Sequence, residues 1–392
     1  MVEEAHLQRA WSAEDAHVLR RKGHLKEQDA LIEFIISLFK THTVREAFTK
    51  VERWVDEHRA GGSSRTSTLR RLVPCVGEFF TRLPLVSALE RYDSWSGLTR
   101  RRYVAPNFAE VRHVLNLAQV AASSSSLKCI TFDADGTLYA DGHHFREDNA
   151  MIRKILALLD EGLHVGIVTA AGYPGDAARY EARLSALLDA FRERQLPPEL
   201  AQNFHVVGGE CNYLLRLDAN FRLEFVPPEQ WQLPEMLAWT QADVDALLDT
   251  AEAALLRESE ALQLPVELVR KPRACGVVPI GPTVYETLED LALRLQDALA
   301  ASTSMPFCAF NGGNDVFCDV GNKSLGLQAL QRYLRVAPAH VMHCGDRFTV
   351  TGNDNQVRGC CSILWVASPD ETAFVVGILL DEMQRSRRGA AR

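Results

Sequence analysis

The sequence contains no run of 18 apolar residues, and a helix that spans a bilayer needs about that many, so no membrane-spanning segment is expected. Its first residues include early acids and no apolar stretch, which argues against a secretory signal peptide. The nine cysteines form no CxxC pair and no zinc-ligand spacing. We therefore expect a cytoplasmic protein with reduced thiols and no disulfide framework.

A strong charge of one sign is also missing. The chain has 43 lysines and arginines against 51 aspartates and glutamates, a net charge of −8, which excludes a general binder of polyanions. No basic segment is interleaved with aromatic residues, so nucleic acid is not an expected partner. Residues 1–120 carry 19 basic against 15 acidic residues, and the other 272 residues carry 24 against 36. This division predicts two regions with different roles.

Four serines at 123–126 separate two kinds of pattern. Residues 1–122 place apolar side chains at helical spacing, which predicts a helical region for regulation or oligomerisation. After the serines, short apolar segments alternate with helical patterns, as in a parallel sheet covered on both faces. We expect this α/β core to comprise residues 127–208 and 319–392, with an α+β cap domain of residues 209–318 inserted into it.

Two carboxylates directly follow the first apolar segment of the expected core. Asp133 and Asp135 belong to the sequence DADGT, and one carboxylate of such a pair can attack a substrate while the other moves protons. The alternative interpretation of DADGT is a turn in which Asp and Gly have only their usual structural roles. A calcium loop fails because its sixth position, which needs glycine, is Leu138, and its twelfth position, which needs glutamate, is His144.

Polar side chains also lie at or near the ends of later apolar segments. Parallel sheets bind ligands at the carboxyl ends of their strands. Thr169 ends the second segment, where its hydroxyl and free N–H groups could hold phosphate. Asp346 follows the segment at 340–344, and its carboxylate together with Asp133 suits Mg²⁺. Lys323 begins a helix just before that segment and could neutralise the gathered negative charge.

These residues resemble, in order, the four motifs of the haloacid dehalogenase superfamily of phosphatases, which have a Rossmann-like sheet. The resemblance implies that Asp133 is the nucleophile of an aspartyl-phosphate mechanism and that Asp135 is the general acid and base. Thr169 and Lys323 would hold the phosphoryl group. Asp133, Asp135 and Asp346 would bind Mg²⁺, with support from Asn353 or Asp354. Because 154 residues separate Thr169 from Lys323, the cap is expected between the second and third motifs.

A closer resemblance covers about residues 72–372 and is to the IMP-specific 5′-nucleotidases. It rests on the segments LVPCVGEFFTRLPL, RRYVAPNFAEVRHVLNLAQ, TFDADGTLYADG, VGIVTAAGY, VVGGECNYLLR, GNKSLGLQAL and LWVASPDET. It implies Mg²⁺-dependent hydrolysis of inosine 5′-monophosphate (IMP), a homotetramer and activation by ATP. The alternatives are a sugar-phosphate phosphatase or mutase of the same superfamily, and a catalytically inactive protein that senses nucleotides.

Further candidates surround this set. Asp141, six residues after Asp135, could bind a ribose hydroxyl or remain a solvated turn acid, and Arg273 could meet the phosphate or remain a surface charge. The expected substrate-binding residues are Thr137, Asp141, Ala170, Arg273, Asn311, Gly313, Asn314 and Asp315. In the basic front region, Arg100, Arg101 and Arg102 are candidates for binding an anionic effector, with solvated surface charge as the alternative.

Overall fold

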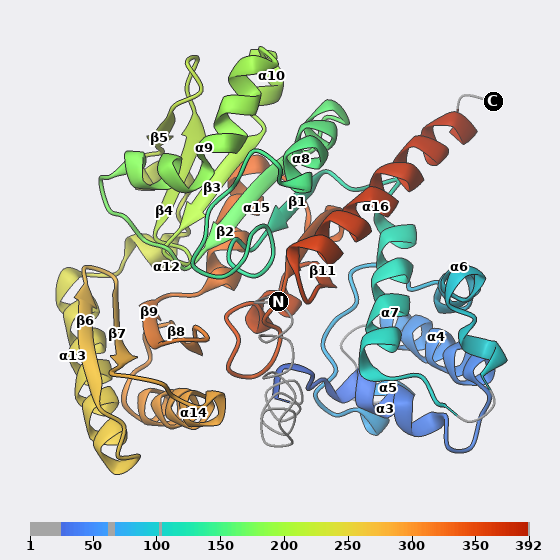
Figure 1. The fold of residues 1–392 in the computed structure, drawn as a ribbon, viewed down its shortest axis with the longest axis horizontal. Coiled ribbons are helices and arrows are strands. Elements are labelled where there is room, and N and C mark those ends of the chain that lie inside the picture. The colour runs from blue at the N-terminus through green and yellow to red at the C-terminus, as the bar shows by residue number, and fades with distance from the viewer. Residues whose placement is uncertain (1–24, 62–66, 102–103, 391–392) are drawn as a thin grey trace, which may run out of the picture.

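The computed structural model describes residues 25–61, 67–101 and 104–390, and its strands form two sheets (Figure 1). The first sheet has the order β11-β10-β1-β2-β3-β4-β5. Its five parallel strands are β1 (Cys129–Phe132), β2 (His164–Thr169), β3 (Phe204–Gly208), β10 (Val341–Gly345) and β11 (Ser362–Trp365). The first strand along the chain, β1, lies in the interior of the sheet. The next two, β2 and β3, follow on one side of it, and β10 and β11 lie on the other side. This Rossmann-like order opens a ligand crevice between β1 and β10.

The parallel strands are almost wholly apolar because helices cover both faces of the sheet. In β1, Ile130 and Phe132 join the apolar cluster beneath α8, α9 and α16, whereas Cys129 joins the cluster beneath α15. The covering helices are α8 (Ala150–Asp160), α9 (Ala177–Glu193), α15 (Lys323–Leu334) and α16 (Pro369–Ala390). Alternate strand residues are therefore buried on opposite faces.

Two antiparallel strands, β4 (Tyr213–Leu217) and β5 (Leu223–Phe225), extend this sheet beside β3. The second sheet is wholly antiparallel, has the order β6-β7-β9-β8 and packs against two helices through its own apolar cluster. This second unit consists of α13 (Gln241–Ala261), β6 (Val266–Lys271), β7 (Ala274–Pro279), α14 (Tyr285–Ser302), β8 (Phe307–Asn311) and β9 (Val316–Val320). The expected insertion at 209–318 thus contains both a part of the core sheet and most of the second unit.

The N-terminal helices are α3 (Ala30–Leu38), α4 (Val44–Ala60), α5 (Thr68–Leu72), α6 (Leu85–Ser96) and α7 (Phe108–Ser123). Capping boxes begin α4 and α7: Thr43 pairs with Glu46, and Asn107 pairs with Glu110. Each box satisfies backbone N–H groups that have no partner within the first helical turn. Among the described residues, no helix has both the length and the apolar character needed to cross a membrane.

Helix α7 lies beside α16 and the edge strand β11 (Figure 1). The Asn116 side chain donates to the carbonyl oxygen of Trp365 at 2.7 Å and accepts from the backbone N–H of Trp365 at 3.1 Å. Apolar residues of the N-terminal helices and of the parallel sheet form one continuous cluster. The helical region is therefore packed against the core as part of one hydrophobic interior.

Candidate active site

Two predicted carboxylates lie at the crevice between β1 and β10. Asp133 follows the last residue of β1, and its backbone N–H donates to the carbonyl oxygen of Cys344 at 2.8 Å. Asp346 follows Gly345, the last residue of β10. At Gly136, where φ is +76°, an added Cβ would lie 2.6 Å from Asp346 Oδ2. Glycine is therefore required there both for the backbone conformation and for the close approach of Asp346.

Lys323 is fully buried at the start of α15 and points at this crevice. Its Nζ donates to Asp133 Oδ1 and to Asp354 Oδ1, each at 2.6 Å. Burial alone would lower the pKa of Lys323, but Asp133 and Asp354 raise it well above its ordinary value. The ammonium therefore stays charged and holds the two carboxylates together.

Negative charge still exceeds positive charge around Lys323. Asp133, Asp346 and Asp354 each bring a carboxylate oxygen to within 4.8 Å of the others. Burial raises the pKa of Asp133 to about 6 despite the opposing effect of Lys323. Burial also raises the pKa of Asp346 to about 7 despite Arg347. Asp346 Oδ1 is buried and has no hydrogen-bond partner among the described residues.

A hard divalent cation fits this donor set. All the gathered ligand atoms are oxygens, which Mg²⁺ prefers, and a bound cation would favour the ionised carboxylates. The unpartnered Asp346 Oδ1 would also gain a partner. The residues present can therefore hold Mg²⁺ through Asp133 and Asp346.

Asp354 and Asn353 have different surroundings. Asp354 accepts from Lys323, from His343 Nε2 at 3.1 Å and from the backbone N–H of Arg347 at 3.0 Å. Burial alone would raise the pKa of Asp354, but Lys323 and His343 hold it well below its ordinary value. Asn353 donates to Glu210 Oε1 at 2.9 Å, and its Oδ1 has no hydrogen-bond partner in the described chain. Asp354 is thus suited to position Lys323, whereas Asn353 presents a free amide oxygen.

Asp135 is held away from this buried group, at the opening of the site. Its Oδ1 accepts from Arg183 Nη2 at 2.7 Å and from the backbone N–H of Gly142 at 3.0 Å. Arg183 comes from α9 and lies over the Tyr139 ring, 5.5 Å from its centroid. The Asp135 side chain remains 26% exposed, so it can exchange protons with a leaving group or with water.

A cavity of about 200 Å³ lies between the core and the second unit. Its lining comprises Asp133, Asp135, Asp141, Thr169, Ala170, Ala171, Tyr173, Arg183, Lys271, Phe310, Gly312, Asp315, Phe317, Asp319, Arg347 and Asn353. Arg347 joins the two units, because its guanidinium donates to the carbonyl oxygens of Asn311 and Gly312 and to Asp141. The arrangement brings carboxylates and guanidinium groups around one small polar space.

Other predicted substrate residues lie outside the lining of this cavity. Thr137 is buried, and its hydroxyl has no hydrogen-bond partner within the described ranges. Asn311 accepts from the backbone N–H of Gly313 at 2.8 Å and borders a smaller cavity beside Asp346. Asn314 is exposed, and Arg273 Nη1 is buried without a hydrogen-bond partner in the part of the chain described. The roles of these residues stay predictions.

Two of the three effector candidates are described, and both precede α7 in the chain. Arg100 is exposed, and Arg101 forms an ion pair with Glu110 at 2.5 Å. Arg102 lies outside the described residues. Effector binding at this cluster also stays a prediction.

Sequence reasoning missed Arg183, Glu210 and Arg347 as site residues. Glu210 comes two residues after β3, so the strand-end rule that selected Asp133 could have found it. Burial raises the pKa of Glu210 to about 7 despite the nearby Lys323. Arg347 directly follows Asp346, and that adjacency was a usable signal. Arg183 stands within a long helix with no motif around it, so only the tertiary structure shows its role.

Known proteins are similar to this chain over most of its length. A family model described as IMP-specific 5'-nucleotidase matches residues 21–376. The IMP-specific 5'-nucleotidase 1 of Aspergillus fumigatus is 42% identical over 344 residues, which cover 85% of this chain and 76% of that protein.

Solved structures of the Plasmodium falciparum IMP-nucleotidase are also similar. An IMP-bound, N-terminally truncated form has a TM-score of 0.84 and 34% identity, covering 90% of this chain and 96% of the other. An ATP-bound form has a TM-score of 0.81 and 34% identity, covering 91% and 86%. The expected family is confirmed, and so is the expected fold class of a Rossmann-like parallel-sheet core with an added α+β unit and N-terminal helices. This chain belongs to the IMP-specific 5′-nucleotidase family.

Proposed function

We propose that this protein hydrolyses IMP to inosine and phosphate. The observation that carries the proposal is the buried Asp133–Lys323 pair beside Asp346, at the crevice of the sheet. A carboxylate that is ionised, oriented and partly neutralised in this way is suited to nucleophilic attack on a phosphate ester. Family membership selects a purine nucleotide as the substrate.

In the first proposed step, a carboxylate oxygen of Asp133 forms a bond to phosphorus and the bond from phosphorus to the ribose O5′ breaks. Asp135 gives its proton to O5′, so inosine leaves as a neutral alcohol. Lys323 donates hydrogen bonds to the reacting carboxylate and offsets the charge that remains. The enzyme then carries an aspartyl phosphate.

In the second step, Asp135 takes a proton from a water molecule, and the water oxygen attacks phosphorus. The bond between phosphorus and the Asp133 oxygen breaks, which releases phosphate and restores the carboxylate. The 26% exposure of the Asp135 side chain gives that water access. Arg183 keeps Asp135 in place during both proton transfers.

Mg²⁺, when bound, would offset the negative charge of the phosphate and of the carboxylates. Asp133 and Asp346 would hold it, together with the backbone carbonyl oxygen of Asp135 and with support from Asn353 or Asp354. Thr169 and Ala170 border the same cavity and could hold phosphate oxygens. On the opposite wall, Phe310 and Phe317 offer aromatic surface for the hypoxanthine ring, while Asp141 and Asp315 offer acceptors to the ribose.

The decisive experiment measures phosphate release from IMP, AMP, GMP and glucose 6-phosphate, with Mg²⁺ and with EDTA. We expect IMP to be preferred and EDTA to abolish turnover. Asp133→Asn should lose phosphate release entirely, while Asp148→Asn, at an exposed position, should behave as the wild type. Faster turnover of the sugar phosphate would favour the sugar-phosphatase alternative. IMP binding without turnover would favour the sensor alternative.

We also propose activation by ATP, a homotetrameric assembly and a cytoplasmic location. Support for ATP comes from the ATP-bound Plasmodium relative; the assembly and the location rest on the family resemblance. IMP turnover with and without ATP tests the first. Light scattering of the purified protein tests the second, and imaging of a tagged chain in cells tests the third.

A further inference from the structure

Glu210 is a buried carboxylate that the proposed reaction does not use. It comes two residues after β3 and is fully buried. Its backbone is left-handed, with φ at +63°. Residues other than glycine adopt this conformation rarely, and those that do are concentrated at functional sites, where the surrounding structure holds them in place. The fold therefore keeps a carboxylate at a position where both its burial and its backbone cost free energy.

The backbone of Glu210 contacts two elements that carry predicted catalytic groups. Its N–H donates to the carbonyl oxygen of Thr169, the last residue of β2, at 3.0 Å. A Cβ added to Gly326, in the first turn of α15, would lie 2.4 Å from the carbonyl oxygen of Glu210. Helix α15, which begins at Lys323, therefore packs directly on the backbone of Glu210. Glu210 is thus fixed between the end of β2 and the helix that carries Lys323.

The side chain of Glu210 reaches a third element, the loop that follows β10. Its Oε1 accepts from Asn353 Nδ2 at 2.9 Å, and its Oε2 is buried with no hydrogen-bond partner within the described ranges. Asn353 is itself buried. A buried carboxylate that is satisfied at only one oxygen is a net cost to folding. Stability therefore does not explain why a glutamate occupies this position.

The carboxylate determines which end of the Asn353 amide faces it. A side-chain amide has a donor nitrogen and an acceptor oxygen, whereas an ionised carboxylate only accepts hydrogen bonds, and a protonated one still keeps an acceptor oxygen. The amide nitrogen of Asn353 therefore faces Glu210, and the amide oxygen points away from it. That oxygen, Oδ1, is buried and has no hydrogen-bond partner in the part of the chain that the structure describes.

The neighbouring Asp354 is already engaged at both of its oxygens. Its Oδ1 accepts from Lys323 and His343, and its Oδ2 accepts from the backbone N–H of Arg347. Asn353 borders the catalytic cavity and offers an oxygen of the hard type that Mg²⁺ prefers. Of the two residues that are expected to support the metal, Asn353 is therefore the one with an uncommitted oxygen.

We propose that Glu210 is a positioning residue for the metal site: it holds the Asn353 amide so that the amide oxygen is available to the cation bound by Asp133 and Asp346. Glu210 acts through Asn353 and not by contact with the substrate. Groups that orient a metal ligand in this way commonly change metal affinity by roughly 10- to 100-fold when they are replaced. The inference rests on the metal site of the proposed function.

Two conservative variants separate the hydrogen bond of Glu210 from its charge. Glu210→Gln keeps the length and an acceptor oxygen but loses the charge, whereas Glu210→Asp keeps the charge but is one methylene shorter. Mn²⁺ binding to the full chain, without nucleotide, is measured by the loss of the electron paramagnetic resonance signal of free Mn²⁺. We expect Glu210→Gln to bind as the wild type does and Glu210→Asp to bind about tenfold more weakly. Glu199→Asp, at an exposed position, is the matched control.

A double-mutant cycle tests whether Glu210 acts through Asn353. Asn353→Ala should weaken Mn²⁺ binding about tenfold, and Glu210→Asp added to it should cause no further loss, because residues that act through one contact are not additive.

IMP turnover provides a second readout. Glu210→Asp should raise the Mg²⁺ concentration for half-maximal turnover about tenfold and leave the KM for IMP at saturating Mg²⁺ unchanged. Urea unfolding in EDTA accompanies each variant, because a residue that only stabilised the fold would change the unfolding midpoint and not the Mg²⁺ dependence.

Three results would overturn the inference. One is that Glu210→Asp binds Mn²⁺ as tightly as the wild type. Another is that Glu210→Gln binds more weakly than Glu210→Asp, which would show that the charge matters and the hydrogen bond does not. The third is that the losses of Glu210→Asp and Asn353→Ala add in the double variant.

These results are distinct from a failure of the proposed function. A wild type that binds no Mn²⁺ would overturn the metal site of the proposed function, and this inference with it. A chain that shows the expected order of Mn²⁺ affinities and leaves IMP intact would support the role of Glu210 and overturn only the hydrolysis.

Discussion

Asp346→Asn should stabilise the metal-free protein while destroying its catalytic function. Burial raises the pKa of Asp346 to about 7 from an ordinary 3.8. The folded state therefore binds this proton more tightly than the unfolded state does. As the pH rises from about 4 to about 7, the wild type loses stability because the buried group must ionise, and the asparagine variant avoids that loss.

The shift of about three pKa units corresponds to about 4 kcal/mol at 1.36 kcal/mol per unit. The neighbouring Asp133 and Asp354 carboxylates account for part of this effect. We therefore expect the free energy of unfolding of the asparagine variant to exceed that of the wild type by about 2–4 kcal/mol above pH 7. Arg347 keeps its contacts with Asp141 and two carbonyl oxygens, so no guanidinium is left unpaired.

Urea unfolding followed by circular dichroism, in EDTA at about pH 8 and about pH 4, measures the effect. The variant should be more stable at about pH 8 and equal to the wild type at about pH 4. Added Mg²⁺ should stabilise the wild type and leave the variant unchanged. Asp148→Asn serves as the exposed control. A variant less stable than the wild type at about pH 8 in EDTA would show that ionised Asp346 does not destabilise the folded state.

Three further substitutions probe the same site. Lys323→Met should cost about 3–5 kcal/mol in urea unfolding near neutral pH, because it leaves buried carboxylates unpaired; an effect no larger than that of Lys40→Met, on the surface, would contradict this. Gly345→Ala places a Cβ against the Asp354 carboxylate and should cost about 1–3 kcal/mol in thermal unfolding. Gly359→Ala, which has open space around it, is the control. Asp135→Asn should lower phosphate release from IMP by about 10²–10⁴ with unchanged thermal stability, and near-normal turnover would remove Asp135 from its assigned role.

The parallel core was predictable because its strands are buried on both faces and therefore read as short continuous apolar segments. The ends of these apolar segments could therefore be located in the sequence. Asp133, Thr169 and Asp346 could be selected as converging groups before the pairing of the strands was known. Lys323 was predictable only as a member of an ordered motif set. Its hydrogen bonds to Asp133 and Asp354 depend on how α15 packs against the sheet.

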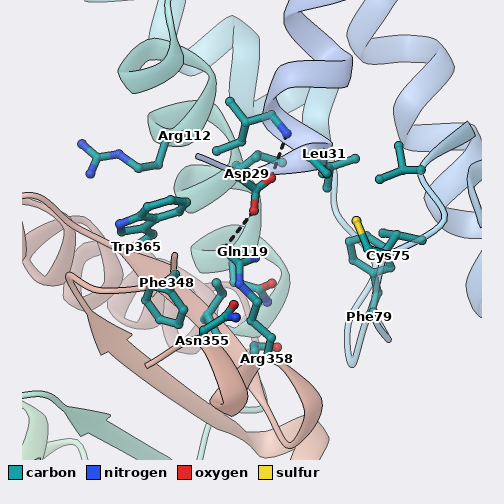
Figure 2. Close-up of a pocket in the computed structure, with 18 of the residues that line it drawn as sticks. Asp29, Leu31, Cys75, Phe79, Arg112, Gln119, Phe348, Asn355, Arg358 and Trp365 are labelled. Carbon is teal, nitrogen blue, oxygen red and sulfur yellow. Dashed lines mark hydrogen bonds and ion pairs between the residues drawn. The ribbon is translucent and has the colours of Figure 1, made fainter. Parts of the chain in front are cut away.

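What could not be predicted depends on partners far apart in the sequence. Tyr213–Leu217 pairs with β3 in the core sheet, and nothing in its own pattern shows which sheet it joins. Arg183 reaches Asp135 across 48 positions. The cavity between the N-terminal helices and the α/β core (Figure 2) is lined by segments from residue 28 to residue 365, so no local pattern indicates it.

The pair of hydrogen bonds between Asn116 and Trp365 protects the chain from self-association. β11 is one of the two edge strands of the seven-stranded sheet, and an open edge presents unpaired N–H and C=O groups that can recruit a strand from another molecule. The Asn116 amide occupies one such N–H and C=O pair as a neighbouring strand would. A chain cut down to its α/β core would lose that cover, and the edge would become a template for aggregation.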